Sequence, residues 1–157
     1  MIRAADRVFE YPLVDRDPVD RWTFGRTTLL GDAAHPMYPI GSNGASQAIL
    51  DARTLAYELA TRPTIDAALA AYEATRRPAT NRLVLVNRGN GPEQVMQLAH
   101  ERAPKGFADV SEVLSREELE ATAGEYKRIA GFDREALNSR ASLDPPVRTR
   151  PLAPARP

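Results

Sequence analysis

The chain has 157 residues with 21 basic and 21 acidic side chains, and it contains no cysteine. A neutral chain has no overall field to attract nucleic acid or an anionic membrane, and without cysteine it has no disulfides or thiolate chemistry. No stretch approaches the about 20 apolar residues of a membrane span, and residues 1–7 lack the apolar core of a signal peptide. The composition therefore predicts a soluble, cytoplasmic protein of one domain.

Short β segments are predicted ahead of Gly31. Residues 8–14 have the composition of a strand interrupted by a proline, which favours an edge strand entering a turn. Residues 22–24 and 27–30 are interpreted as a strand pair or as one bent strand. The second of these is expected to be a short buried strand that delivers the chain to Gly31.

A rigid loop follows the last predicted strand. Asp32 stands at the carboxyl end of that strand, where side chains of an open α/β sheet are free to face a ligand such as a sugar hydroxyl. Pro36 and Pro39 stiffen the loop, because each fixes φ and restricts the residue before it. Gly41 and Gly44 let the backbone turn into a helix and let a ligand approach the main chain. Function is predicted to lie here.

A long amphipathic helix is predicted after this loop. Ser42 or Asn43 is expected to be its N-cap, and Pro63 closes it. The first turn offers unpaired N–H groups and the positive end of the helix dipole to an anion or an electron-rich carbonyl. Small and apolar side chains at helical spacing form a single stripe along the helix: Ala45, Ala48, Ile49, Ala52, Leu55, Ala56 and Leu59.

Further helices are predicted along the rest of the chain. They cover residues 64–75, with an apolar continuation to 86 beyond an expected kink at Pro78, then 93–102, 115–129 with a capping box, and 133–137. The helix of residues 93–102 is expected to turn Val95, Met96 and Leu98 inward. Arg76 and Arg77 are assigned to solvated or ion-paired surface, and Glu73 precedes Arg77 at the favourable i, i+4 spacing.

One stretch carries a family resemblance. The run Gly25–Met37, followed by Pro39, Gly41, Gly44, Gln47-Ala48 and Asp51-Ala52, closely resembles the second flavin-binding motif of the single-component FAD-dependent aromatic hydroxylases. Within that family the chain is most similar to the salicylate- and phenazine-hydroxylase branch. Members of this branch also carry a Tyr-Glu-x-x-Arg-Arg-Pro segment like residues 72–78. Both motifs occur in the family's order.

The resemblance implies an α/β fold that is α+β within this chain. A small β region precedes a mainly helical region, as in the carboxyl-terminal part of an FAD/NAD(P)-binding, Rossmann-like flavoprotein. Residues 1–62 are assigned to the FAD-binding domain, 63–143 to a helical region, and 144–157 to a proline-rich tail predicted to be disordered. The sequence contains no Gly-x-Gly-x-x-Gly turn for the FAD pyrophosphate. We therefore expect a truncated piece whose amino-terminal FAD-binding portion is supplied in cis or in trans.

Individual roles follow from the same resemblance. The family aspartate that matches Asp32 hydrogen-bonds a ribityl hydroxyl of FAD, and the main chain that matches Gly44 and Ala45 donates to the pyrimidine end of the flavin. Residues assigned to the cofactor are Gly31, Asp32, Pro39, Gly41, Asn43, Gly44 and Ala45. The substrate-side candidates, by position alone, are Met37, Tyr38 and Pro39. No catalytic residue can be named from this chain.

The implied function is hydroxylation of a small aromatic or heteroaromatic substrate by an FAD enzyme that uses NAD(P)H and O2. Two alternatives stay open: a non-enzymatic helical interaction module that retains a relic flavin motif, and a flavoprotein oxidase or dehydrogenase of the same fold. A phosphate-binding Walker loop is rejected because residues 41–46 lack the required lysine. His35 is expected to be packed rather than to bind a metal, since His100 is the one other histidine. A homodimer is an arrangement that the sequence allows.

Overall fold

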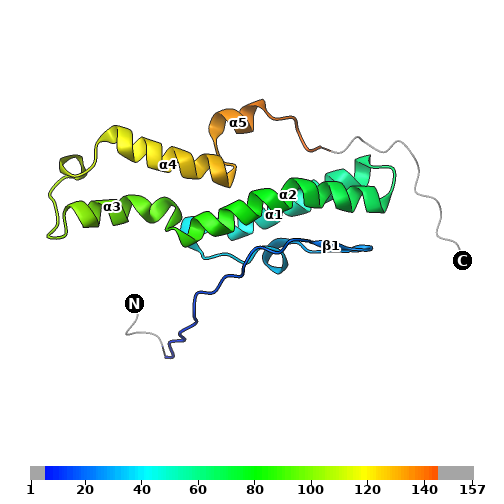
Figure 1. Ribbon diagram of the computed structural model, residues 1–157, viewed down its shortest axis with the longest axis horizontal. Helices are drawn as coiled ribbons and strands as arrows, with labels where there is room; N and C mark the ends of the chain where they lie inside the picture. The colour runs from blue at the N-terminus through cyan, green and yellow to red at the C-terminus, as the bar shows by residue number, and fades with distance from the viewer. Residues whose placement is uncertain (1–5, 145–157) are drawn as a thin grey trace, which may run out of the picture.

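The computed structural model describes residues 6–144, and its centre is a pair of long helices packed side by side (Figure 1). A small β-hairpin lies along one side of the pair, and shorter helices extend from one end. With η marking a 3₁₀ turn, the elements are β1 (Thr23–Phe24), β2 (Thr27–Thr28), η2 (Gly31–Ala33), η3 (Ile40–Ser42), α1 (Gly44–Thr61), α2 (Ile65–Arg88), η4 (Gly91–Glu93), α3 (Gln94–Arg102), η5 (Val110–Glu112), α4 (Arg116–Ala130) and α5 (Arg134–Ser139).

The predicted strand pair is confirmed, although it is short. β1 and β2 are antiparallel with Thr23 opposite Thr28, and the Leu29 N–H extends the ladder to the Trp22 carbonyl at 3.1 Å. The expected burial of this second strand is wrong, because Leu30 is 36% exposed and a two-stranded ribbon cannot cover both of its faces. Residues 8–14 form no strand, so that prediction is wrong. In residues 6–144 the fold is thus mostly helical with a small sheet.

One core cluster holds the hairpin against α2. Trp22 and Tyr72 are fully buried, and their ring centroids lie 5.8 Å apart. Burial, followed by the charge of Asp51, raises the pKa of Tyr72 well above its usual value, so its hydroxyl stays a donor. That hydroxyl donates to the Leu29 carbonyl at 3.0 Å. The Thr23 N–H donates to the Glu73 carboxylate at 2.8 Å. Two adjacent residues of α2 therefore bind the hairpin, one at β1 and the other at the residue after β2.

A second cluster joins α4 to the far end of α2. Leu83, Tyr126 and Ala130 are buried there, and Met37 and Ile129 pack around them. Because these contacts and those of Tyr72 cross residue 62, residues before and after that point share one packed unit. The division at residues 62 and 63 stays a prediction, and the proline-rich tail from residue 145 onward lies outside the described residues.

The capping residues predicted from the sequence open two of the helices in the structure. Thr64 caps α2 by accepting from the Ala67 N–H at 3.2 Å, and the capping box of Ser115 and Glu118 opens α4 as predicted. α2 runs through Pro78 without a break. The predicted inward direction of Met96 is wrong: it is 64% exposed, because α3 packs toward α4 and η4 with Ala99 buried instead.

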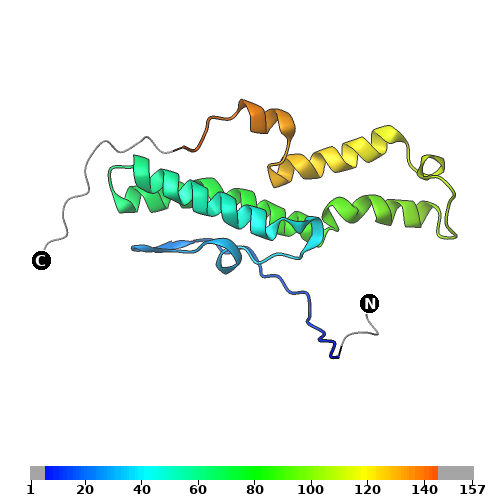
Figure 2. The ribbon, with the colours of Figure 1, turned by 180° about the vertical axis from the view of Figure 1, so that it is seen from behind.

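Most of the apolar stripe of α1 is exposed, although Ala48 and Leu55 are half-buried and Leu55 packs against the cluster of Trp22 and Tyr72. Ile49 is 69% exposed and Leu59 is 41% exposed, whereas such a stripe normally faces the core. In the view from behind, α1 is the nearest element, and no other described element lies in front of it (Figure 2). The buried face of α1 and its cap is polar, and it consists of Asn43, Gln47, Asp51, Thr54 and Glu58.

Gly41 tests how tightly the loop before α1 is packed. Its φ is +73°, and an added Cβ would clash with the Tyr126 hydroxyl. We therefore expect Gly41→Ala to lower the free energy of unfolding by about 1 to 3 kcal/mol, measured by chemical denaturation followed by circular dichroism. Gly124→Ala is the matched control, because nothing lies within 4 Å of its added Cβ and alanine favours the helix. Equal effects of the two substitutions would contradict the packing at Gly41.

Candidate functional site

The Gly-Asp turn lies directly against the start of α1. Gly31 has a φ of +58°, and a Cβ there would lie 3.2 Å from the Ala48 Cβ, so only glycine allows this approach without strain. Asp32 is exposed on the turn. A Cβ added to Gly44 would lie 4.0 Å from Asp32 Oδ1, which places this carboxylate beside the first turn of α1. The structure thus brings together the two parts of the predicted site.

The backbone before α1 has two consecutive residues in the left-handed conformation. Gly41 and Ser42 both have positive φ, +73° and +53°, and the chain then enters α1 at Gly44. Asn43 holds the predicted N-cap position, but its side chain makes no cap hydrogen bond. It is buried and donates instead to the Tyr126 hydroxyl, which donates to Asn87 Oδ1 at 2.9 Å. The first N–H groups of α1 therefore have no side-chain acceptor within the described residues.

The substrate-side candidates occupy the outer part of the loop. Pro39 is exposed, and Met37 and Tyr38 are half-buried. Met37 packs against the cluster of Leu83 and Tyr126, and the Tyr38 carbonyl accepts from Asn87 Nδ2 at 3.4 Å. These contacts attach the loop to the second core cluster.

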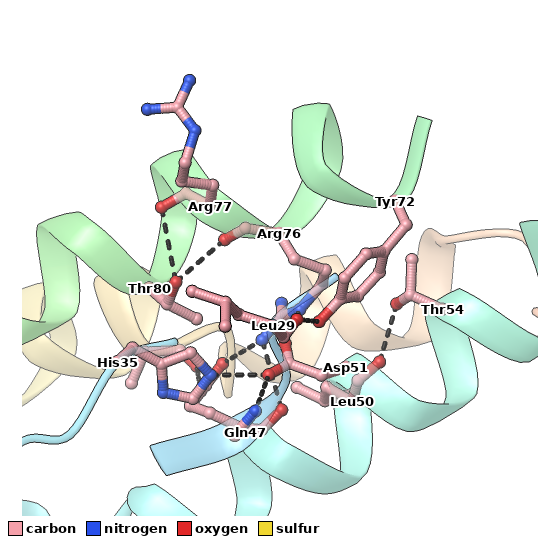
Figure 3. Close-up of polar contacts among 12 residues, drawn as sticks. Leu29, His35, Gln47, Leu50, Asp51, Thr54, Tyr72, Arg76, Arg77 and Thr80 are labelled. Atoms are coloured by element: carbon pink, nitrogen blue, oxygen red, sulfur yellow. Dashed lines mark hydrogen bonds and ion pairs between the residues drawn. The ribbon is translucent and has the colours of Figure 1, made fainter. Parts of the chain in front are cut away.

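A buried ionic network, which sequence reasoning missed, lies beneath the turn (Figure 3). Asp51 is 0% exposed, and its Oδ1 accepts from Arg76 Nε at 2.7 Å. Its Oδ2 lies 2.5 Å from His35 Nε2 and accepts from the Gly31 N–H at 3.1 Å. Arg76 Nη2 also donates to Gln47 Oε1 at 2.6 Å. The network joins the Gly-Asp turn, α1 and α2.

The two adjacent arginines of α2 have different environments. Arg77 keeps the predicted i, i+4 ion pair with Glu73 at 3.2 Å near the surface. The surface assignment of Arg76 is wrong, because its side chain is 90% buried against Asp51, whereas Arg77 points away from α1 (Figure 3). The missed signal is that Gln47 and Asp51 share one face of α1, opposite the apolar stripe.

The Asp51 carboxylate is ionised although it is buried. Burial by itself would raise its pKa, but the hydrogen bonds from His35, Arg76 and the Gly31 N–H outweigh that effect and hold the pKa below its usual value. His35 is packed as predicted, 2% exposed, with its ring centroid 5.7 Å from that of Trp22. The turn therefore rests on a fully paired buried charge.

The hollows of this surface lie elsewhere. One, of about 340 Å³, is lined by residues of α2, η4, α3 and α4 that include Val86 and Tyr126. Another, of about 500 Å³, lies between Arg21 and Glu73. Neither hollow is lined by Asp32 or Gly44.

Comparison with known proteins fits this geometry. Residues 13–86 match the family model described as the FAD binding domain. This segment is thus similar to the FAD binding domain family. The matched residues contain the hairpin, the Gly-Asp turn, α1 and most of α2, and so include every residue of the predicted site.

Relatives of this chain are named as hydroxylases or monooxygenases. A phenazine 1,6-dicarboxylic acid hydroxylase of Lysobacter antibioticus is 57% identical over 88 residues, which cover 56% of this chain and 22% of that protein. 3-Hydroxybenzoate 6-hydroxylase 1 of Aquipseudomonas alcaligenes is 62% identical over 47 residues, 30% of this chain and 12% of that protein. A 6-hydroxynicotinate 3-monooxygenase of Bordetella bronchiseptica is 49% identical over 55 residues, 35% and 14% of the two chains.

These matches confirm the resemblance to FAD-dependent aromatic hydroxylases. The chain spans between 12% and 22% of the length of these three curated relatives. Within residues 6–144, no helix has both the length and the apolar character needed to cross a membrane.

The two arginines allow a matched test of the network. Arg76→Met should lower the free energy of unfolding by about 3 kcal/mol or more, because the buried Asp51 carboxylate loses the cation that pairs with it. Arg77→Met removes a partly exposed pair and should cost at most about 1 kcal/mol. The difference between the losses in the two variants should become smaller in acid. The stabilisation from ionised Asp51 is present above the ordinary pKa of an aspartate and is lost as the pH falls and Asp51 is protonated. Urea denaturation at several pH values measures both; equal losses at neutral pH would contradict the network.

Proposed function

We propose that this chain is the carboxyl-terminal part of an FAD-dependent monooxygenase that hydroxylates an aromatic or heteroaromatic substrate with NAD(P)H and O2. The observation that carries the proposal is the corner between Asp32 and Gly44, which lies inside the segment that matches the FAD binding domain family. The relatives named as hydroxylases and monooxygenases support hydroxylation over simple oxidation.

The residues at this corner suit the ribityl and pyrimidine parts of FAD. Asp32 is exposed and its carboxylate makes no hydrogen bond within residues 6–144, so it is free to accept from a ribityl hydroxyl. The N–H groups at Gly44 and Ala45 begin α1, where the helix dipole favours an electron-rich carbonyl and the negative charge of a reduced flavin. FAD, when bound, supplies the oxygen-transfer chemistry. This chain would hold the cofactor and orient it.

Neither backbone conformation nor packing requires a glycine at position 44, which supports the assignment of Gly44 to the cofactor site. Its φ is not positive, and an added Cβ would meet nothing closer than Asp32 Oδ1 at 4.0 Å. The conformation and packing of the described residues therefore leave room for a side chain at this position. A flat ligand lying against the main chain is a reason for glycine there.

The exposed stripe of α1 supports a missing amino-terminal portion. Ile49 and Leu59 are exposed together with Ala45, Ala52 and Ala56, and exposed apolar side chains that gather on one face commonly mark an interface. We propose that the amino-terminal part of the FAD-binding domain covers this face, supplied in cis or in trans. The chain spans at most 22% of the three relatives compared above, and that part would also bring the pyrophosphate site.

A chimera tests the proposal. In the Lysobacter hydroxylase, the 88 aligned residues would be replaced by those of this chain. The purified chimera should be yellow, with one FAD per chain, and should consume NAD(P)H faster when phenazine 1,6-dicarboxylic acid is added. The present chain alone should be colourless after gel filtration with FAD, because it lacks contacts to the pyrophosphate. A folded chimera without flavin would contradict the proposal.

Asp32→Ala in the chimera should weaken FAD binding about ten- to a hundredfold, because an acceptor for a buried hydroxyl is lost. Fluorescence titration of the apoprotein with FAD measures the change. Asp66→Ala is the control, since Asp66 is also an exposed aspartate, in the first turn of α2. Unchanged affinity in Asp32→Ala would show that this carboxylate does not contact the cofactor.

A further inference from the structure

We infer that Asp51 is a positioning residue that fixes the turn bearing Asp32 relative to the first turn of α1. The inference rests on the proposed function only in taking FAD as the ligand of that turn. Its basis is a single atom: Asp51 Oδ2 accepts from the Gly31 N–H at 3.1 Å and lies 2.5 Å from His35 Nε2. One oxygen thereby holds both ends of the turn.

The turn is closed by its own backbone as well. The N–H groups of Ala34 and His35 both donate to the Gly31 carbonyl, at 2.8 and 2.9 Å. Gly31, Ala34 and His35 are buried, whereas Asp32 and Ala33 between them are exposed. Asp32 is therefore the free tip of a turn whose two ends are fixed from below.

The Asp51 carboxylate that binds the turn is itself held in place by further hydrogen bonds. Asp51 Oδ1 accepts from Arg76 at 2.7 Å, and Arg76 also donates to Gln47 Oε1 at 2.6 Å. Gln47 Nε2 donates to the Ala130 carbonyl at 2.9 Å, which connects the network to the end of α4. Because Asp51 and Gly44 are on the same helix, the network sets the Asp32 carboxylate and the helix N-terminus in one geometry. Ligand sites need such support from residues behind the contacting groups.

Asp51→Asn removes this function while keeping the side-chain shape. The amide has one acceptor oxygen, so it cannot accept from Arg76 on one side and from Gly31 and His35 on the other. In the chimera we expect the Kd for FAD to rise about tenfold, the effect of one lost hydrogen bond to a charged group. Glu58→Gln is the control: it is a second buried carboxylate on this face of α1, bonded to Arg62 and not to the turn. It should leave the Kd unchanged.

Two further measurements separate positioning from general destabilisation. If Asp51 acts through Asp32, adding Asp51→Asn to Asp32→Ala should raise the Kd no more than about twofold beyond Asp32→Ala alone. In the present chain without FAD, amide hydrogen exchange at Gly31 and His35 should be faster in Asp51→Asn and unchanged in Glu58→Gln. Should Asp51→Asn not fold, His35→Phe replaces it, because it keeps a ring beside Trp22 but breaks one end of the turn, and His35→Gln should restore part of the affinity.

The outcomes distinguish this inference from the proposed function. Additive effects of Asp32→Ala and Asp51→Asn, or an unchanged Kd and unchanged exchange in Asp51→Asn, would overturn the positioning role. If Asp32→Ala does not alter FAD binding but exchange at Gly31 still responds to Asp51→Asn, the proposed cofactor site fails while the support of the turn by Asp51 stands.

Discussion

The buried charge of Asp51 is the constraint on which the rest of this structure depends. An ionised carboxylate without water is very costly unless donors surround it, and here the donors come from the Gly-Asp turn and from α2. Satisfying this charge forces the polar face of α1 toward α2. The position of the turn and the burial of Arg76 follow from this pairing.

The same constraint explains why α1 exposes most of its apolar stripe. A helix has two sides, and the side with Gln47 and Asp51 is already occupied by α2 and the end of α4. In the complete enzyme that we propose, the opposite side packs against the amino-terminal part of the FAD-binding domain. α1 would then join two layers, with its N-terminus and Asp32 at the edge between them, where a cofactor could contact both.

Much of the fold could be predicted because its signals are local. Caps such as Thr64 and Ser115, together with glycine and proline breaks, set the helix boundaries within a few residues, since each acts over one turn of chain. The exposure of the strand that begins at Thr27 and the direction of Met96 could not be predicted in this way. Their burial depends on which neighbours cover them, and the residues that cover α3 come from α4 and η4.

The sequence by itself determined the ingredients of the site: a Gly-Asp turn, a stiff loop, a helix N-terminus at Gly44 and their resemblance to a flavin motif. Tertiary structure alone decided that the polar face of α1 is fully buried, because the pattern of small apolar residues favoured a face that is mostly exposed. It also decided the pairing of Asp51 with Arg76, which are 25 positions apart. Local propensity carries no information about such a pair, since the two side chains meet only when α2 folds back along α1.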